Sequence, residues 1–600
     1  MNRLSLKSYP DTSTVNYTYD NDSRLTQVTD PTGTYQFTFD NMGRLTGTST
    51  QYTVLTSRAF ATSYGYDAAS NRTSFTDPEN GSSSYVYDTL NRLQTLTPPT
   101  AYGTGSFGLG YDALSRRTSL TRPNTVNTTY GYDNLSRLLS VTHAKGGVTL
   151  DGATYTVDNA GNRTAKSDLY AGGTTNYGYD NIYELLNATQ GGSTTESYTY
   201  DPVGNRLTAL GSATWSYNTS NELNSRPGAS YAFDANGNTI VKTDGTGSTS
   251  YTWDFENRLG SVTLPGAGGT VTFKYDPFGR RIYKSSSSGT SVYAYDGDNL
   301  VEETNATGGV VARYSQGLNI DEPLAMLRSS ATSYYQADGL GSVTSLTNTA
   351  GTAAQNYTYD SFGNIIATTG SLVNSFRYTG REWDTETSLY YYRARYYDPN
   401  SGRFASEDPI GFGSGQNNFY SYVANSPLGN LDPWGLARCT YIIGGLGGQP
   451  GPNGRPDGIL ICLPDDPRHD QVIIPVASGN NGDSAHHCKN NPNCQPDQGH
   501  GPLSPGSYQW GGDSLTHKRL GGKHLFPIPG TGTSSLGADG RFLTHWCKDP
   551  FGPSLHPYSD GHYCSEGCVT GMPDDIQKLN RLLNAEPGST LLVVPGPFQM

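Results

Sequence analysis

Two sets of residues in this 600-residue sequence have types and spacings that could support catalysis. Near the C-terminus, His556 precedes Cys568 by twelve residues, and Ser565 and Gly567 stand just before the cysteine. A thiolate is the reactive form of cysteine, and a neighbouring imidazole can accept the thiol proton. Small residues beside a nucleophile leave room for a substrate carbonyl and for backbone N–H groups that bind an oxyanion. This arrangement predicts a cysteine nucleophile with His556 as its base.

Other readings of the same segment stay open. His545 is a second candidate base and His562 a third, although a surface or packing role is the simpler interpretation for both. Cys568 could instead be half of a disulfide, as in many secreted, cysteine-rich domains. Seven cysteines are an odd number, so six can pair and one thiol is left over. The pairs Cys488–Cys494 and Cys547–Cys564 are hypotheses.

The second set consists of two aspartates in related motifs. Asp432 opens Asp-Pro-Trp-Gly-Leu, which ends at Leu436, and Asp408 opens Asp-Pro-Ile-Gly upstream. Two adjacent carboxylates cannot both ionise readily, so one keeps a proton and the pair can act as acid and base on a peptide bond. On the residues alone, the favoured interpretation is that both aspartates merely open Asp-Pro turns.

A sharp change in composition separates the two sets. Residues 1–436 contain no Cys and a single His, His143, whereas residues 437–600 contain all seven Cys and nine His. Of the 44 Tyr, 40 lie before residue 437. Such a step predicts two modules with different roles.

Charge and hydropathy exclude several classes of protein. The net charge of −13 argues against nucleic-acid binding as the main role, because phosphate contacts need Lys and Arg. No run of 18 apolar residues predicts a membrane span. The first residues lack the apolar stretch of a secretory signal, so export would need another route. The chain begins almost inside a repeat, which is consistent with a longer parent protein.

A repeat of about twenty residues fills most of the first module. The unit reads Tyr-x-Tyr-Asp, then Arg-Leu, then Thr, and each predicts a strand, a turn at the Asp and a returning strand. One such hairpin cannot bury its own face, so the units must stack. We therefore expect a long, curled antiparallel sheet over residues 1–375. The repeated Asp residues are Asp20, Asp40, Asp67, Asp88, Asp112, Asp133, Asp180, Asp201, Asp276, Asp296 and Asp360.

This repeat resembles the YD-repeat family, whose sheets wind into a hollow shell around a passenger. Residues 376–436 resemble the RHS-associated core, through Arg377-Tyr378-Thr379-Gly380, Leu389-Tyr390-Tyr391-Tyr392 and the closing Asp432-to-Leu436 motif. That resemblance implies an RHS polymorphic toxin whose shell cuts itself from its passenger after Leu436. It assigns Asp432 to the cleavage, with Asp408 as its partner.

Residues 437–600 are expected to form a small β-rich toxin domain with a helix at residues 573–585. The Ser-x-Gly-Cys sequence at 565–568, preceded by His556-Pro557, resembles the L,D-transpeptidase-like effector domain. The resemblance implies that Cys568 attacks peptidoglycan stem peptides, with no cofactor and no metal. It also implies a secreted antibacterial toxin acting in the periplasm of its target, with an immunity protein and a secretion component as partners and no nucleic acid.

Two alternatives to this enzyme remain from the residues themselves. A metal-dependent nuclease is one, because a group of side chains has zinc-ligand types, although in no standard spacing. A disulfide-stapled binding domain without catalysis is the other. The metal-ligand types are His486, His487, Cys488, Cys494 and His500.

Overall fold

The computed structural model describes residues 3–212, 214–414 and 416–436 and, farther along, the backbone of eight strands between Cys439 and Val593. The chain divides into two compact units, Met1–Arg438 and Cys439–Met600. The described residues are almost entirely strands and turns, as the repeat predicted. No helix among them is long and apolar enough to cross a membrane.

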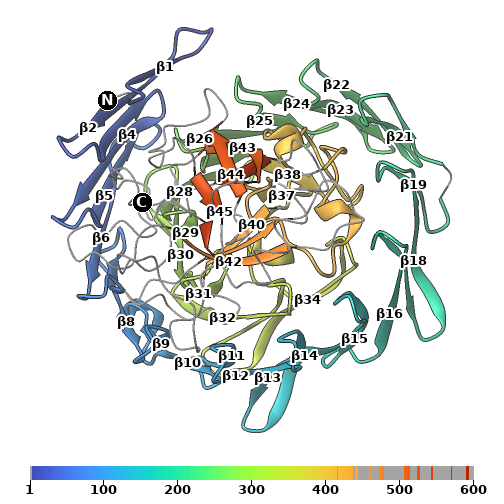
Figure 1. Ribbon diagram of the computed structural model, residues 1–600, viewed down its shortest axis with the longest axis horizontal. Coiled ribbons are helices and arrows are strands. Elements are labelled where there is room, and N and C mark those ends of the chain that lie inside the picture. Colours follow the sequence, from blue (N-terminus) through green and yellow to red (C-terminus); the bar gives the residue numbers. More distant parts are fainter. Residues whose placement is uncertain are drawn as a thin grey trace. The chain divides into compact units, whose positions relative to one another are not determined.

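The first unit contains two long antiparallel sheets and one short one. The first sheet has 19 strands, from β1 (Leu6–Ser8) to β19 (Arg206–Ala209), and the second has 16, from β20 (Ser216–Tyr217) to β35 (Ile365–Gly370). In Figure 1 the first sheet follows an arc from blue to teal, and the second continues it from green to yellow. Consecutive strands pair within each of the two sheets, so both sheets are built from local hairpins.

In the repeats that carry an arginine after the turn, the Asp and the Arg connect neighbouring turns. In the turn between β10 (Phe107–Tyr111) and β11 (Arg117–Thr121), the backbone N–H groups of Leu114 and Arg116 donate to Asp112 Oδ1, both at 2.9 Å. Arg116 Nε donates to Asp112 Oδ2 at 2.6 Å, and its Nη1 donates to the backbone O of Asp133 in the next turn at 2.9 Å. The same arginine lies over the Tyr132 ring. The motif therefore closes its own turn and fixes the next one beside it.

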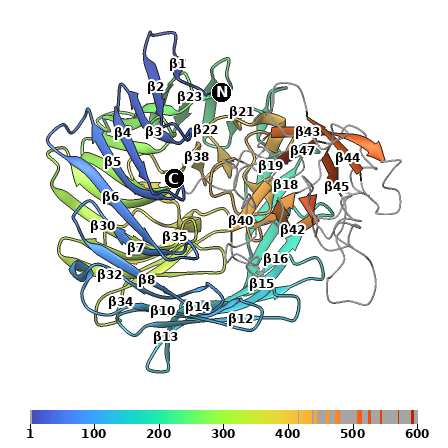
Figure 2. The same cartoon turned by 60° about the vertical axis from the view of Figure 1, so that its left-hand side comes forward.

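The second sheet packs against the first. Tyr35 and Tyr52 of the first sheet share a buried cluster with Ile282 and Val292 of the second. Arg72 pairs with Asp296 at 2.6 Å across the same contact, and Arg313 pairs with Asp77. Arg313 lies on β30 (Val310–Gln316), and Asp77 directly follows β7 (Arg72–Thr76). Farther along, Tyr334 of β32 (Ala331–Ala337) packs its ring against Phe107 of β10 at a centroid distance of 6.0 Å. Figure 2 shows the same molecule turned so that the strands of the two sheets can be followed. Aromatic rings supply much of this core.

The short sheet carries the segment that ends the first unit. It consists of β36 (Glu382–Asp384), β37 (Leu389–Tyr392), β38 (Arg395–Asp398) and β39 (Arg403–Phe404). Tyr390, Tyr392, Tyr397 and Tyr422 form its buried aromatic cluster. The buried Arg281 of β27 (Arg281–Ser286) pairs with Glu382 at 2.8 Å and with Asp384. These contacts hold the short sheet against the second long sheet.

The second unit has an eight-stranded sheet, in agreement with the β-rich expectation. All described pairings in it are antiparallel except that of β45 with β46. The expected helix at residues 573–585 lies outside the described residues, as do Cys568, His556, Ser565, Gly567 and His545. The strands are β40 (Cys439–Ile443), β41 (Gly458–Cys462), β42 (Val472–Ser478), β43 (Gly506–Asp513), β44 (Lys523–Pro527), β45 (Phe542–Thr544), β46 (Val569–Thr570) and β47 (Thr590–Val593).

Candidate functional site

Asp408 and Asp432, 24 residues apart in the chain, meet at one guanidinium group. Arg395 Nη2 lies 2.9 Å from Asp408 Oδ2 and 3.4 Å from Asp432 Oδ2. The three side chains are only 1–2% exposed. Two carboxylates around a single cation leave a net negative charge when both are ionised. The structure thus brings together the two aspartates that the sequence suggested as a pair.

The Asp432 side chain turns back over its own motif. Its Oδ1 accepts a hydrogen bond from the backbone N–H of Leu436 at 2.9 Å. Burial, helped by the neighbouring Asp408 and opposed by Arg395, raises the pKa of Asp432 to about 6. Near neutral pH, Asp432 can therefore either hold or release a proton, as an acid–base group must.

The backbone before Leu436 is held along the turn between β37 and β38. Arg395 Nε donates to the backbone O of Gly435 at 2.6 Å, and the Ala394 N–H donates to that of Trp434 at 3.1 Å. Gly435 has a φ of +67°, and a Cβ there would overlap the backbone O of Tyr392 and lie 3.1 Å from the Arg395 nitrogen. Only glycine fits this close approach without strain.

Arg395 is fixed by several contacts besides the two carboxylates. Its guanidinium lies 3.6 Å from the centroid of the Phe404 ring, and its Nη1 donates to the backbone O of Phe419 at 2.7 Å. The Asp408 N–H donates to that same Phe419 oxygen at 3.1 Å. A buried guanidinium with this many partners has a well-defined orientation.

Sequence reasoning missed Arg395 as a functional residue. The arginine was visible only as one letter in a tyrosine-rich run, Tyr391-Tyr392-Arg393-Ala394-Arg395-Tyr396. A signal was nevertheless present, because a charged residue between core aromatics needs a buried counter-charge. The sequence could not show that Asp408 and Asp432 both provide it.

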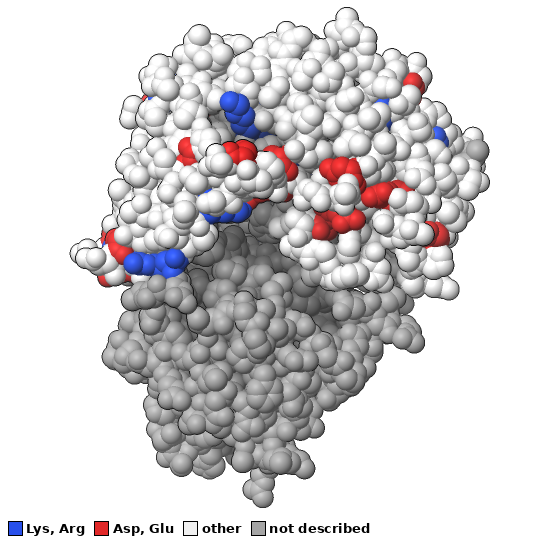
Figure 3. Space-filling model, turned by 90° about the horizontal axis from the view of Figure 1, so that it is seen from above, with Lys and Arg blue, Asp and Glu red and all other residues white. Residues whose placement is uncertain are grey.

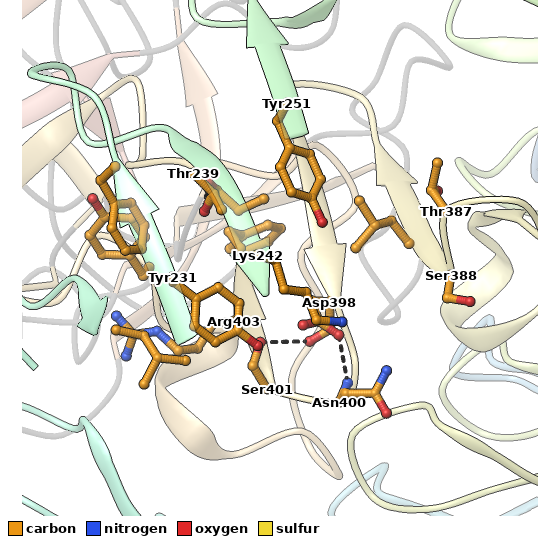
Figure 4. Close-up of a pocket in the computed structure, with 16 residues that line it drawn as sticks. Tyr231, Thr239, Lys242, Tyr251, Thr387, Ser388, Asp398, Asn400, Ser401 and Arg403 are labelled. Carbon is orange, nitrogen blue, oxygen red and sulfur yellow. Dashed lines mark hydrogen bonds between the residues drawn. The ribbon is translucent and has the colours of Figure 1, made fainter. Parts of the chain in front are cut away.

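A separate pocket lies between the second long sheet and the short sheet. Tyr231, Lys242 and Tyr251 line it from one side and Asp398 and Ser401 from the other (Figure 4). Asp398 Oδ1 accepts the Asn400 N–H at 2.9 Å. Phe404, whose ring lies against the Arg395 guanidinium, also lines this pocket. The pocket and the aspartate pair are therefore connected through one shared side chain.

The described surface does not gather basic side chains on the face drawn in Figure 3. Most of its described residues are uncharged, several Asp and Glu side chains gather on the right of the view, and the Lys and Arg side chains are scattered. A nucleic-acid-binding face would present clustered Lys and Arg. The described residues on this face form no such basic cluster.

Comparisons with known proteins agree with this architecture. The family model described as Teneurin YD-shell matches residues 163–428, and the RHS Repeat model matches residues 19–53 and 110–148. The first unit is thus an antiparallel β-sheet shell that is similar, over these ranges, to the RHS and YD-repeat families. A crystal structure of TcdB2-TccC3-Cdc42 shares the fold, with a TM-score of 0.60 and 19% identity over 72% of this chain and 27% of that one.

Two of the relatives that this chain matches are named as nucleases. The tRNA3(Ser)-specific nuclease WapA of Bacillus spizizenii is 32% identical over 254 residues, which are 40% of this chain and 11% of the relative. The probable deoxyribonuclease RhsA of Dickeya dadantii is 44% identical over 72 residues, 12% of this chain and 5% of the relative. The chain thus spans a small part of each.

These relatives overturn two expectations from the sequence. The cysteine L,D-transpeptidase built on Cys568 and His556 is wrong, since the relatives are named as nucleases. The expected partners, a peptidoglycan stem peptide and no nucleic acid, are wrong for the same reason. Short spacings of Cys and His fit disulfides and metal sites as well as nucleophiles. The net charge of −13 belongs largely to the shell, because residues 437–600 carry 11 basic and 14 acidic residues.

Proposed function

We propose that this chain is part of a secreted polymorphic toxin, in which the shell carries a nucleic-acid-degrading unit, residues 437–600, and releases it by cutting itself after Leu436. The observation that carries the release step is the placement of Asp432. Its buried carboxyl group touches the Leu436 N–H and shares Arg395 with Asp408. The Leu436–Ala437 peptide bond follows directly.

The proposed cleavage is a hydrolysis by an aspartate pair. Salt-bridged Asp408 takes a proton from water, whose oxygen adds to the Leu436 carbonyl carbon, while protonated Asp432 gives its proton to the carbonyl oxygen. The resulting diol collapses as Asp408 passes its proton to the Ala437 nitrogen and Asp432 recovers its own. The C–N bond breaks, leaving a Leu436 carboxyl group and an Ala437 amino group. Arg395 balances the charge of the pair throughout.

The nuclease assignment rests on the relatives' names and on residue types in the second unit. WapA is named as a tRNA nuclease and RhsA as a probable deoxyribonuclease. The zinc-ligand types at His486, His487 and His500 would suit a metal-assisted attack on a phosphodiester. Release would separate this unit from an acidic shell that repels nucleic acid.

The release step is tested by expressing the full chain and measuring intact masses. Wild-type chain should give two fragments, 1–436 and 437–600, whereas Asp432→Asn should give a single 600-residue species. Asn keeps the shape and the Leu436 contact but cannot exchange the proton. Glu407→Gln, a partly exposed acid beside Asp408, is the matched control and should cut normally. An Asp432→Asn chain that is cut at the same bond would refute the assignment.

The nuclease activity is tested with the same purified full chain. It is incubated with tRNA and with double-stranded DNA, with and without EDTA. We expect degradation of at least one nucleic acid by wild type, and loss of that activity in His487→Ala and His500→Ala chains that still cut themselves. Intact tRNA and DNA after incubation with fully cut wild type would contradict the nucleic-acid-degrading unit.

A further inference from the structure

Residues 433–436, which lead to the proposed cleavage point and are called the release segment below, are held by a second arginine besides Arg395. Arg393 Nη1 donates to the backbone O of Pro433, the residue after Asp432. Its Nη1 and Nη2 also donate to Asp321, to Oδ2 at 3.1 Å and to Oδ1 at 2.8 Å. One guanidinium therefore joins the peptide that enters the cleavage site to a carboxylate elsewhere in the fold.

The Asp321 carboxylate belongs to the second long sheet rather than to the short sheet. Asp321 lies in the connection between β30 and β31 (Pro323–Arg328), 72 residues before Arg393. Its φ of +57° is a conformation that non-glycine residues rarely adopt. Its side chain is only 9% exposed. The position is thus defined by the packing of the wall around it.

Asp321 is also paired with a second arginine. Arg381 Nη1 donates to Asp321 Oδ1, and Arg381 Nη2 donates to the backbone O of Tyr391 at 3.0 Å. Tyr391 is the next-to-last residue of β37, and the turn that carries Arg393 and leads to Arg395 follows directly after Tyr392. The carboxylate therefore holds the hairpin at two points, and bidentate arginine contacts define orientation as well as distance.

We propose that Asp321 is a positioning residue for cleavage after Leu436. It fixes Arg393 on the Pro433 carbonyl. The reaction therefore depends on the packing of β30 and β31, which belong to the second long sheet, against the short sheet. The inference rests on the proposed self-cleavage. Its consequence is an order of events, in which the shell wall packs first and the passenger is cut free afterwards.

The physical reason is the precision that hydrolysis requires. A displacement of about 1 Å in a reacting group can slow a reaction by about a hundredfold. Without Asp321, Arg393 keeps only the backbone O of Asp298, at 3.2 Å, as a partner on the wall. Residues 433–436 would then lose the stronger of the two links that Arg393 makes to the long sheet, and would depend mainly on the β37–β38 turn. Asp408, Asp432 and Arg395 would remain in contact, so the acid–base chemistry itself would be unchanged.

The test measures the rate at which newly made full-length chain is cut in a cell-free translation reaction after a chase. We expect Asp321→Asn to cut between about ten and a hundred times more slowly than wild type. Asp298→Asn is the matched control, because that exposed side chain makes no hydrogen bond to Arg393 and its charge acts from a distance, while the backbone O that accepts from Arg393 is kept. This variant should cut at close to the wild-type rate. Asp321→Glu, which keeps the charge, should recover part of the loss.

Two further readouts separate positioning from a purely structural salt bridge. Arg393→Gln should be slow, and the double variant Asp321→Asn/Arg393→Gln should be no slower than the slower single variant, since both break one connection. The pH dependence of the residual cleavage should match that of wild type. An Asp321→Asn chain that folds, melts at a lower temperature and cuts at the wild-type rate would overturn the inference. If instead Asp432→Asn still cuts, the proposed function itself fails.

Discussion

The backbone N–H of Leu436 donates a hydrogen bond to Asp432 Oδ1 at 2.9 Å, across four residues of chain. This contact closes the turn at the end of the shell. It places the buried Asp432 carboxyl group at the N–H of Leu436, the residue whose carbonyl carbon is in the bond proposed to break. It also makes Asp432 both the reacting group and a binding group for its own substrate. Changes in the backbone between these two residues should therefore affect the reaction strongly.

Gly435→Ala should slow self-cleavage by about a hundredfold or more. The added Cβ would overlap the Tyr392 backbone O, and alanine is strained at a φ of +67°. Gly429→Ala is the control, because a Cβ there has no atom within 4 Å and φ is not positive. Time courses of fragment formation on gels would compare the two variants. Equal rates for both would show that the close approach of Gly435 is unimportant.

Cleavage should slow as the pH rises above about 6. The proposed mechanism needs Asp432 protonated at the start, and burial raises the pKa of Asp432 to about 6. Each pH unit above that value should reduce the rate about tenfold. Gly435→Ala, purified uncut because it is slow, can be incubated between pH 4.5 and 8.5 for this measurement. A rate that rises through pH 6 instead would assign Asp432 as the base.

Replacing Asp432 should make the shell more stable at neutral pH. A raised folded-state pKa means that the native protein holds a proton which the unfolded chain releases, so wild-type stability falls as the pH rises from about 4 to about 6. The buried charge costs up to about 3 kcal/mol, which Asn avoids. The melting temperature of Asp432→Asn relative to wild type should therefore increase from pH 4 to pH 7.5. Comparing the two pH values removes the constant effect of the cut itself.

The repeat arginines should stabilise the sheet locally through two turns each. Arg116→Lys loses the fork that joins Asp112 Oδ2 to the backbone O of Asp133, since a single ammonium cannot replace it. Hydrogen exchange should become faster in residues 112–116 and 133–137. The turn at Asp254, which has its own arginine, Arg258, serves as the internal control and should keep its protection. Unchanged exchange at both places would mean that these links do not contribute.

Much of the shell could be predicted from sequence because its instructions are local. Each Asp, its turn and the Arg, Asn or Glu that follows lie within five residues, so a twenty-residue repeat specifies a hairpin wherever it occurs. The contact between Asp432 and Leu436 is local too, since four residues separate them, whereas their role in cleavage came from the family resemblance and stays a proposal. The error on the second unit has the opposite cause. A His and a Cys twelve residues apart define no geometry, and the same side chains serve several chemistries.

By itself, then, the sequence determined the antiparallel repeat, the change of character near residue 436 and the Asp432 motif. Only the tertiary structure decided that Arg395 joins Asp408 to Asp432, and that Asp321 reaches the release segment through Arg393. The contacting residues are 13 to 72 positions apart in the sequence, from Arg395 and Asp408 at the closest to Asp321 and Arg393 at the widest. No local pattern encodes such distances, because buried charges find their partners only when the long sheet and the short sheet pack together.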